Sequence, residues 1–158
     1  MNDATETPLF QEAVTRERNR FLAEVRTYVT ERELPDYAAV LDDFIRWSLG
    51  RDELAHVEHK GSQGKFEFVL ARTGQVFWAA YPLKRDDHGA KFVVLTRRSN
   101  LVPDSVRDEV RRRFAQLDSE AETQDVPTLS FRKLFRPAAR TTVTEVLADA
   151  LSAIRSVN

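Results

Sequence analysis

Residues 65–81 read KFEFVLARTGQVFWAAY, two apolar runs separated by a Thr-Gly pair. In the first run apolar residues alternate with other residues, which is the period of a half-buried strand. The second run, 75–81, is apolar at both alternating sets of positions, so both faces of that strand are expected to be buried. Because a short turn can join only antiparallel neighbours, the stretch predicts a hairpin with 75–81 as a central strand.

Further strands are predicted on both sides of this hairpin. Lys91–Thr96 is again apolar on both faces, and Leu129 and Phe131 indicate a short strand later in the chain. Residues 52–60 fit a strand or a helical turn. We favour a strand over Leu54–Lys60, because a Gly-rich turn follows it. Doubly apolar strands need cover on both sides, either from helices of this chain or from a second copy.

Helical periodicity flanks the predicted sheet. Apolar residues recur at helical spacing over Thr7–Arg32, over Leu34–Gly50 and after Pro103. Thr142 and Glu145 form a capping box that predicts the start of a last helix. The acidic stretch Asp118–Asp125 is expected to be an exposed loop.

The chain is therefore predicted to be an α+β protein. We expect an antiparallel β-meander of three to five strands, packed with about four amphipathic helices. Its 158 residues suit one domain, with a helical part at 1–50, the meander at 51–100, and a helix, a short strand and a helix at 101–158.

Composition excludes several classes of protein. The formal net charge is -1, which is unlike the basic excess of a dedicated nucleic-acid binder. The chain has no cysteine, so disulfides and thiolate chemistry are absent. No signal peptide or apolar run of membrane-spanning length is evident, so we expect a cytoplasmic protein without membrane contact. No motif implies a cofactor.

One basic cluster is the candidate binding site. No acidic residue occurs from Val126 to Thr144, and the segment is rich in cations. The candidate residues are Arg97, Arg98, Arg132, Lys133, Arg136 and Arg140. Interleaved Phe131 and Phe135 could stack on bases, which favours a non-catalytic module that contacts nucleic acid or an acidic protein. The competing interpretation places these aromatic rings in the core and the arginines in ion pairs.

A metal-dependent nuclease is the alternative from another class. Glu58 and Lys60 would share a face of one strand, and an aspartate from Asp42, Asp43 or Asp52 would complete the site. His56 and His59 would face opposite sides of that strand and could not share a metal ion, so no metal ligand is assigned. No catalytic residue is assigned either. A purely structural homo-oligomer, such as a homodimer, is the third alternative.

Overall fold

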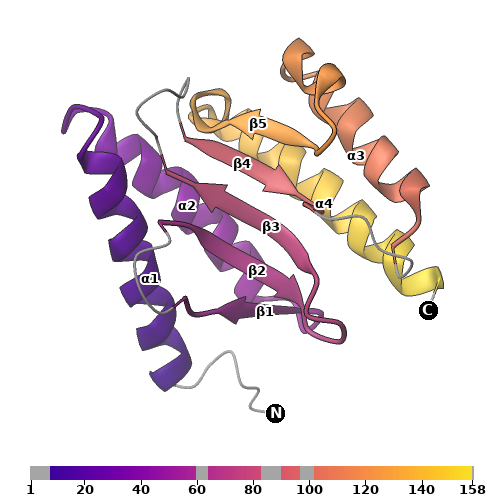
Figure 1. Cartoon of the computed structure of the whole chain (residues 1–158), viewed down its shortest axis with the longest axis horizontal. Helices are drawn as coiled ribbons and strands as arrows, with labels where there is room; N and C mark the ends of the chain where they lie inside the picture. The colour runs from indigo at the N-terminus through magenta and orange to yellow at the C-terminus, as the bar shows by residue number, and fades with distance from the viewer. Residues whose placement is uncertain (1–7, 60–63, 83–89, 97–101, 158) are drawn as a thin grey trace.

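A computed structural model describes residues 8–59, 64–82, 90–96 and 102–157. Figure 1 shows a sheet with long helices at both ends of the chain. The elements are α1 (Pro8–Arg26), α2 (Leu34–Leu49), β1 (Leu54–Val57), β2 (Phe66–Leu70), β3 (Val76–Tyr81), β4 (Lys91–Val94), α3 (Asp104–Ala115), the 3-10 helix η2 (Ser119–Thr123), β5 (Thr128–Ser130), the 3-10 helix η3 (Phe131–Leu134) and α4 (Pro137–Val157).

The sheet confirms the predicted α+β class. Its order is β1-β2-β3-β4-β5, and every neighbouring pair is antiparallel. β3 is the central strand, as its two apolar faces predict. Residues 52–60 contain the strand β1, which is shorter than Leu54–Lys60, and Lys60 lies outside the described residues.

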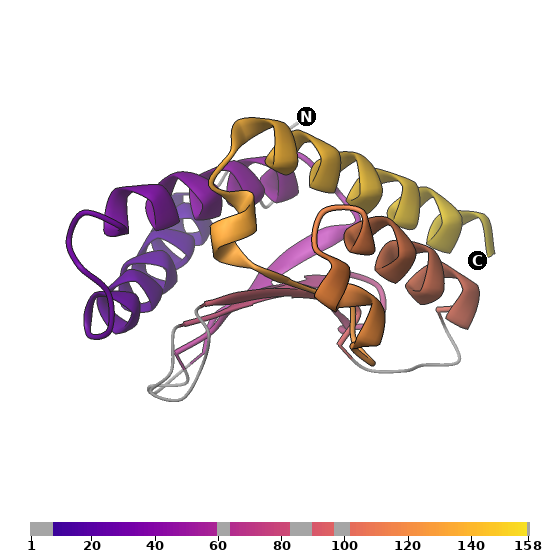
Figure 2. The same ribbon diagram turned by 90° about the horizontal axis from the view of Figure 1, so that it is seen from above.

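The helices α1, α2 and α4 lie on one side of the sheet, and α3 lies beside α4 near the β5 edge (Figure 2). On this side Trp78 is fully buried, with its ring against those of Phe66 and Phe68. Its Nε1 donates a hydrogen bond of 2.7 Å to Ser48 Oγ on α2. This bond satisfies the indole N–H inside an apolar core.

The opposite face of the sheet is also buried. Val69, Ala79 and Val93 point away from the α2 side and are 7%, 0% and 8% exposed. Strand register aligns Glu67 with Ala79, and Ala79 with Val93. The doubly apolar pattern of β3 and β4 thus corresponds to two buried faces. The described helices cover only one of them (Figure 2).

The predicted start of the last helix was wrong. α4 begins at Pro137 rather than at Thr142, because proline is favoured in the first turn, where no N–H donor is needed. Thr142 lies inside the helix, and its hydroxyl donates to Ala138 O at 3.2 Å. A hydroxyl satisfied by the preceding turn cannot act as an N-cap.

Two other predicted boundaries changed. α1 ends at Arg26 rather than near Arg32, in a stretch rich in β-branched residues, which weaken helices. The acidic stretch predicted as a loop contains η2, which buries Ala121 to 1% exposure. The side chain of Asp118 caps this turn by accepting from Glu120 N at 3.1 Å. In the described parts of the chain, no helix is both long enough and apolar enough to cross a membrane.

Candidate functional site

Four of the six predicted cations belong to one continuous segment. Arg132 and Lys133 lie on η3, Arg136 precedes α4, and Arg140 lies in its first turn. The other two, Arg97 and Arg98, lie outside the described residues. Ser130 starts η3, because its Oγ accepts a hydrogen bond of 3.2 Å from Arg132 N. This cap and Pro137 fix the backbone that carries the cluster.

Arg140 holds this segment against the rest of the molecule. Its side chain is only 13% exposed, and its Nε donates to Asp43 on α2 at 2.5 Å. Its Nη1 donates to the carbonyl oxygens of Leu134 and Phe135 at 2.8 and 3.0 Å. These carbonyls end η3, so Arg140 joins η3, α4 and α2. It is a structural side chain and is not available to a ligand.

Arg132 is exposed but paired. Its side chain is 52% exposed, and Nη1 donates to Glu33 Oε1 at 2.5 Å. The hydrogen bond to Glu33 raises the pKa of Arg132. An exposed pair of this kind contributes at most about 1 kcal/mol. A ligand phosphate can therefore replace Glu33 as the partner of Arg132 at low cost.

Lys133 and Arg136 differ from Arg132 and Arg140. Each is exposed, and neither side chain has a hydrogen bond or an ion pair with any part of the chain that the structure describes. Together with Arg132 they form what we call the η3–α4 surface. It presents three cationic side chains within five consecutive residues, next to a helix whose first turn carries no acidic residue.

The two phenylalanines of this segment pack inward. Phe131 is fully buried, with edge-to-face contacts to Phe21 and Tyr37 at centroid distances of 5.8 and 5.7 Å. Phe135 is half-buried, and its ring meets Tyr37 at 5.2 Å in the same geometry. The structure supports the interpretation of these rings as part of the core.

The arginines of α3 all have partners. Arg111 donates to Asp108 at 2.5 Å, Arg112 to Glu109 at 2.6 Å, and Arg113 to Asp149 on α4 at 2.6 Å. Arg107 is 3% exposed, and its Nε donates to Leu95 O at 3.0 Å. This basic stretch therefore offers little unpaired charge.

Three of the four carboxylates of the nuclease alternative, Glu58, Asp42 and Asp43, are paired with arginines, whereas Asp52 lies in the turn between α2 and β1. Glu58 follows β1 and accepts hydrogen bonds from Arg16 on α1. Asp42 accepts from Arg18 at 2.6 Å, while Asp43 is the partner of Arg140. Over residues 8–59, 64–82, 90–96 and 102–157, no three side chains of metal-ligand type gather at one point.

Sequence reasoning missed a buried polar group around β1. Glu67 is 5% exposed, and its Oε1 lies 3.0 Å from His59 Nε2. On the other side of β1, His56 stacks on Phe66, and burial lowers its pKa to about 4. The two histidines thus lie on opposite faces of the sheet, as alternation predicts. The signal available in the sequence was a glutamate, Glu67, between the apolar residues of a strand.

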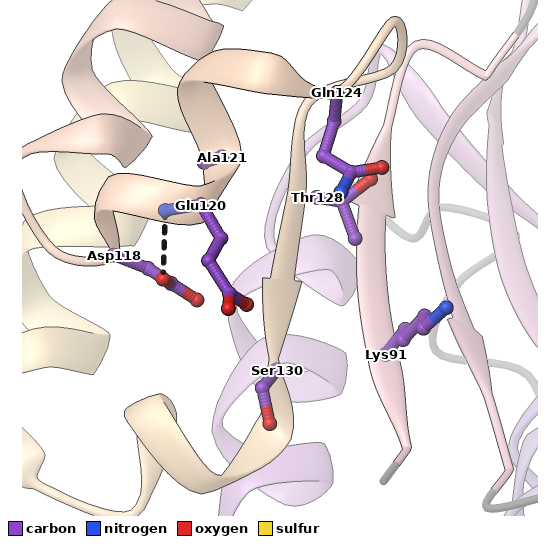
Figure 3. A pocket seen from close by; sticks show the side chains of 7 residues that line it. All are labelled: Lys91, Asp118, Glu120, Ala121, Gln124, Thr128 and Ser130. Atoms are coloured by element: carbon purple, nitrogen blue, oxygen red, sulfur yellow. Dashed lines mark hydrogen bonds between the residues drawn. The ribbon is translucent and has the colours of Figure 1, made fainter. Parts of the chain in front are cut away.

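A pocket of about 110 Å³ lies between η2 and the strands β4 and β5 (Figure 3). It is lined by Lys91, Asp118, Glu120, Ala121, Gln124, Thr128 and Ser130. Three of these polar groups already have protein partners. Asp118 caps η2, Thr128 donates to Val126 O, and Ser130 caps η3. The pocket is well below the ~300 Å³ at which ligand sites usually begin.

No protein family model matches this chain, and no curated protein or solved structure does either. The geometry of its own side chains therefore carries the functional interpretation.

Proposed function

We propose that this protein is a non-catalytic binding module that contacts a polyanionic partner, foremost nucleic acid, through the η3–α4 surface. The observation that carries the proposal is the exposure of Lys133 and Arg136 without a carboxylate partner in the described chain. An acidic protein is the other partner that this charge would suit.

Unpaired, exposed cations are suited to phosphate. A paired arginine must give up a carboxylate before it binds an anion, whereas Lys133 and Arg136 lose only water. The net charge of the chain is -1, so its overall field does not attract a polyanion. Affinity must then come from short-range contacts at this surface, which makes it modest and strongly salt-dependent.

The backbone beneath the surface is ordered before binding. Arg140 joins η3 to α4 and to α2, and the Ser130 cap fixes the start of η3. Because this segment is already held in place, binding requires little ordering of the backbone. Arg132 becomes a third contact when a phosphate replaces Glu33.

The test is a charge reversal at the two unpaired cations. Wild-type protein should bind a fluorescent 20-base-pair duplex at low salt, with a log–log salt slope between about -1.8 for two contacts and about -2.7 for three. Lys133→Glu with Arg136→Glu should weaken binding at least tenfold, as measured by fluorescence anisotropy.

A matched double variant controls for net charge. Arg72→Glu with Arg112→Glu reverses two other exposed cations, one in the β2–β3 turn at the opposite end of the sheet and one on α3 (Figure 1). It should bind almost as well as wild type. No binding by the wild type at low salt, or an equal loss in both double variants, would contradict the proposal.

Self-association is a separate prediction that is compatible with this function. Leu9 and Tyr28 are large apolar side chains that are 80% and 47% exposed, at the beginning of α1 and just after its end. These two side chains are too far apart to form one patch. The prediction therefore rests on the long helix α1 and the doubly apolar strands β3 and β4, because an uncovered apolar face would favour contact with a second copy of the chain. Sedimentation equilibrium at micromolar concentration that gives only the monomer mass would refute this.

A further inference from the structure

The side chains around the η3–α4 surface restrict what it can recognise in a nucleic acid. Sequence-tolerant contact with bases needs exposed aromatic faces on which the bases stack. Phe131 is fully buried, and Tyr37, which packs against it, is also 0% exposed. Phe135 directs its ring against Tyr37. The aromatic residues of this segment are therefore used in the core.

Hydrogen bonding to base edges is limited as well. Asn and Gln read adenine, and Asp and Glu read cytosine, by hydrogen bonds in the major groove. From Phe131 to Thr141 the sequence FRKLFRPAART contains none of these four residue types. The hydroxyl of Thr141 already donates to Pro137 O at 3.2 Å, and Ser130 Oγ caps η3. Among the side chains of this segment, only the cationic groups therefore remain as contacts for a nucleic acid.

We infer that the η3–α4 surface binds the phosphate groups of a nucleic-acid backbone without contacting the bases. This inference rests on the proposed function and specifies its ligand as closely spaced phosphates. Arg132, Lys133 and Arg136 supply the contacts, and sequence does not affect the affinity. The competing possibility is that arginine or lysine bonds the O6 and N7 atoms of guanine, and it predicts a preference for G·C-rich duplexes.

A competition experiment separates phosphate from base recognition. Full-length protein is bound to a fluorescent 20-base-pair duplex at low salt and titrated with inorganic polyphosphate, which has the charge but no bases. Polyphosphate should displace the duplex completely. G·C-rich and A·T-rich duplexes of equal length should bind within about threefold of each other, because phosphate contacts carry no sequence information.

The results distinguish the inference, that the surface binds phosphate alone, from the proposed function, that the protein binds nucleic acid. If the duplex binds but polyphosphate does not displace it, or if one sequence is preferred more than about threefold, the inference is wrong and the proposed function stands. If polyphosphate binds and the duplex does not, the surface takes phosphate but nucleic acid is not its partner. If neither binds, both claims fail.

The charge-reversed variants assign the binding to this surface. Lys133→Glu with Arg136→Glu should lose polyphosphate and duplex binding by the same factor. Arg72→Glu with Arg112→Glu should lose much less of either, because it makes the same change in net charge but leaves the η3–α4 surface intact. Unequal losses for the two ligands would show that the duplex makes contacts other than those to phosphate, and would overturn the inference. A melting curve confirms that both double variants are folded.

Discussion

Two arginine-rich segments of this protein use their charge in opposite ways. On α3, every arginine from Arg107 to Arg113 has a hydrogen-bond acceptor. In the η3–α4 segment, two of four cations have none among the described residues. The difference comes from the neighbouring sequence. α3 places Asp108 and Glu109 three residues before Arg111 and Arg112, where side chains on one helix face meet.

The η3–α4 segment has no such local partners. No acidic residue occurs from Val126 to Thr144, so carboxylates must come from distant parts of the chain. Two carboxylates from the N-terminal half of the chain supply such partners: Glu33 pairs with Arg132, and Asp43 pairs with Arg140. Lys133 and Arg136 have no carboxylate partner among the described residues, and the proposal assigns them to an external partner. Thus the number of arginines in a segment does not indicate how many of its cations lack a carboxylate partner.

The largest effect should come from Arg107, the most buried cation of α3. Its guanidinium bonds the carbonyl of Leu95, whose φ of 52° is unusual for a residue other than glycine. Arg107→Ala should lower the free energy of unfolding by about 2–3 kcal/mol, because a buried carbonyl loses its donor. Urea denaturation measures this. Arg107→Met, which keeps the apolar stem, should recover only part of the loss.

Arg140 should have the next largest effect, although it lies in the segment proposed to bind. Arg140→Ala should lower the free energy of unfolding by about 1–2 kcal/mol, because two carbonyls of η3 lose a charged donor. Arg140→Lys should be about as destabilised as Arg140→Ala, because an ammonium group cannot reach all three acceptors as the planar guanidinium does. A fully stable lysine variant would show that charge alone suffices.

The double variant Lys133→Glu, Arg136→Glu should change the free energy of unfolding by less than about 0.5 kcal/mol, since exposed side chains without partners contribute little to the fold. Its duplex affinity should nevertheless fall at least tenfold. Urea denaturation and anisotropy on the same samples check both values. A large loss of stability would mean that these cations have structural contacts, and the contrast between the two segments would disappear.

Arg112 should show the smallest effect of all. Its side chain is 61% exposed, and its partner Glu109 is also exposed. Arg112→Gln should leave both the melting temperature and the duplex affinity unchanged within error, because exposed ion pairs on a helix are weak. A clear drop in affinity would extend the binding surface onto α3.

Much of the fold could be predicted from the sequence. Alternating and helical periodicities arise from contacts between near neighbours, so residues 65–81 indicated a hairpin with β3 at the centre. The last helix shows the limit of such patterns. Thr142 and Glu145 matched a capping box, but Pro137 allowed the helix to start five residues earlier.

The candidate site depended on tertiary structure to a greater degree. The sequence located the cations and showed that no acid lies near them along the chain. It could not show that Glu33 lies beside Arg132 or that Asp43 lies beside Arg140, because these partners are separated by 99 and 97 residues. Ion pairing depends on distances of a few ångströms, which the packing of α2 against η3 and α4 fixes. The sequence therefore determined where positive charge is concentrated, and only the tertiary structure decided which charges remain available.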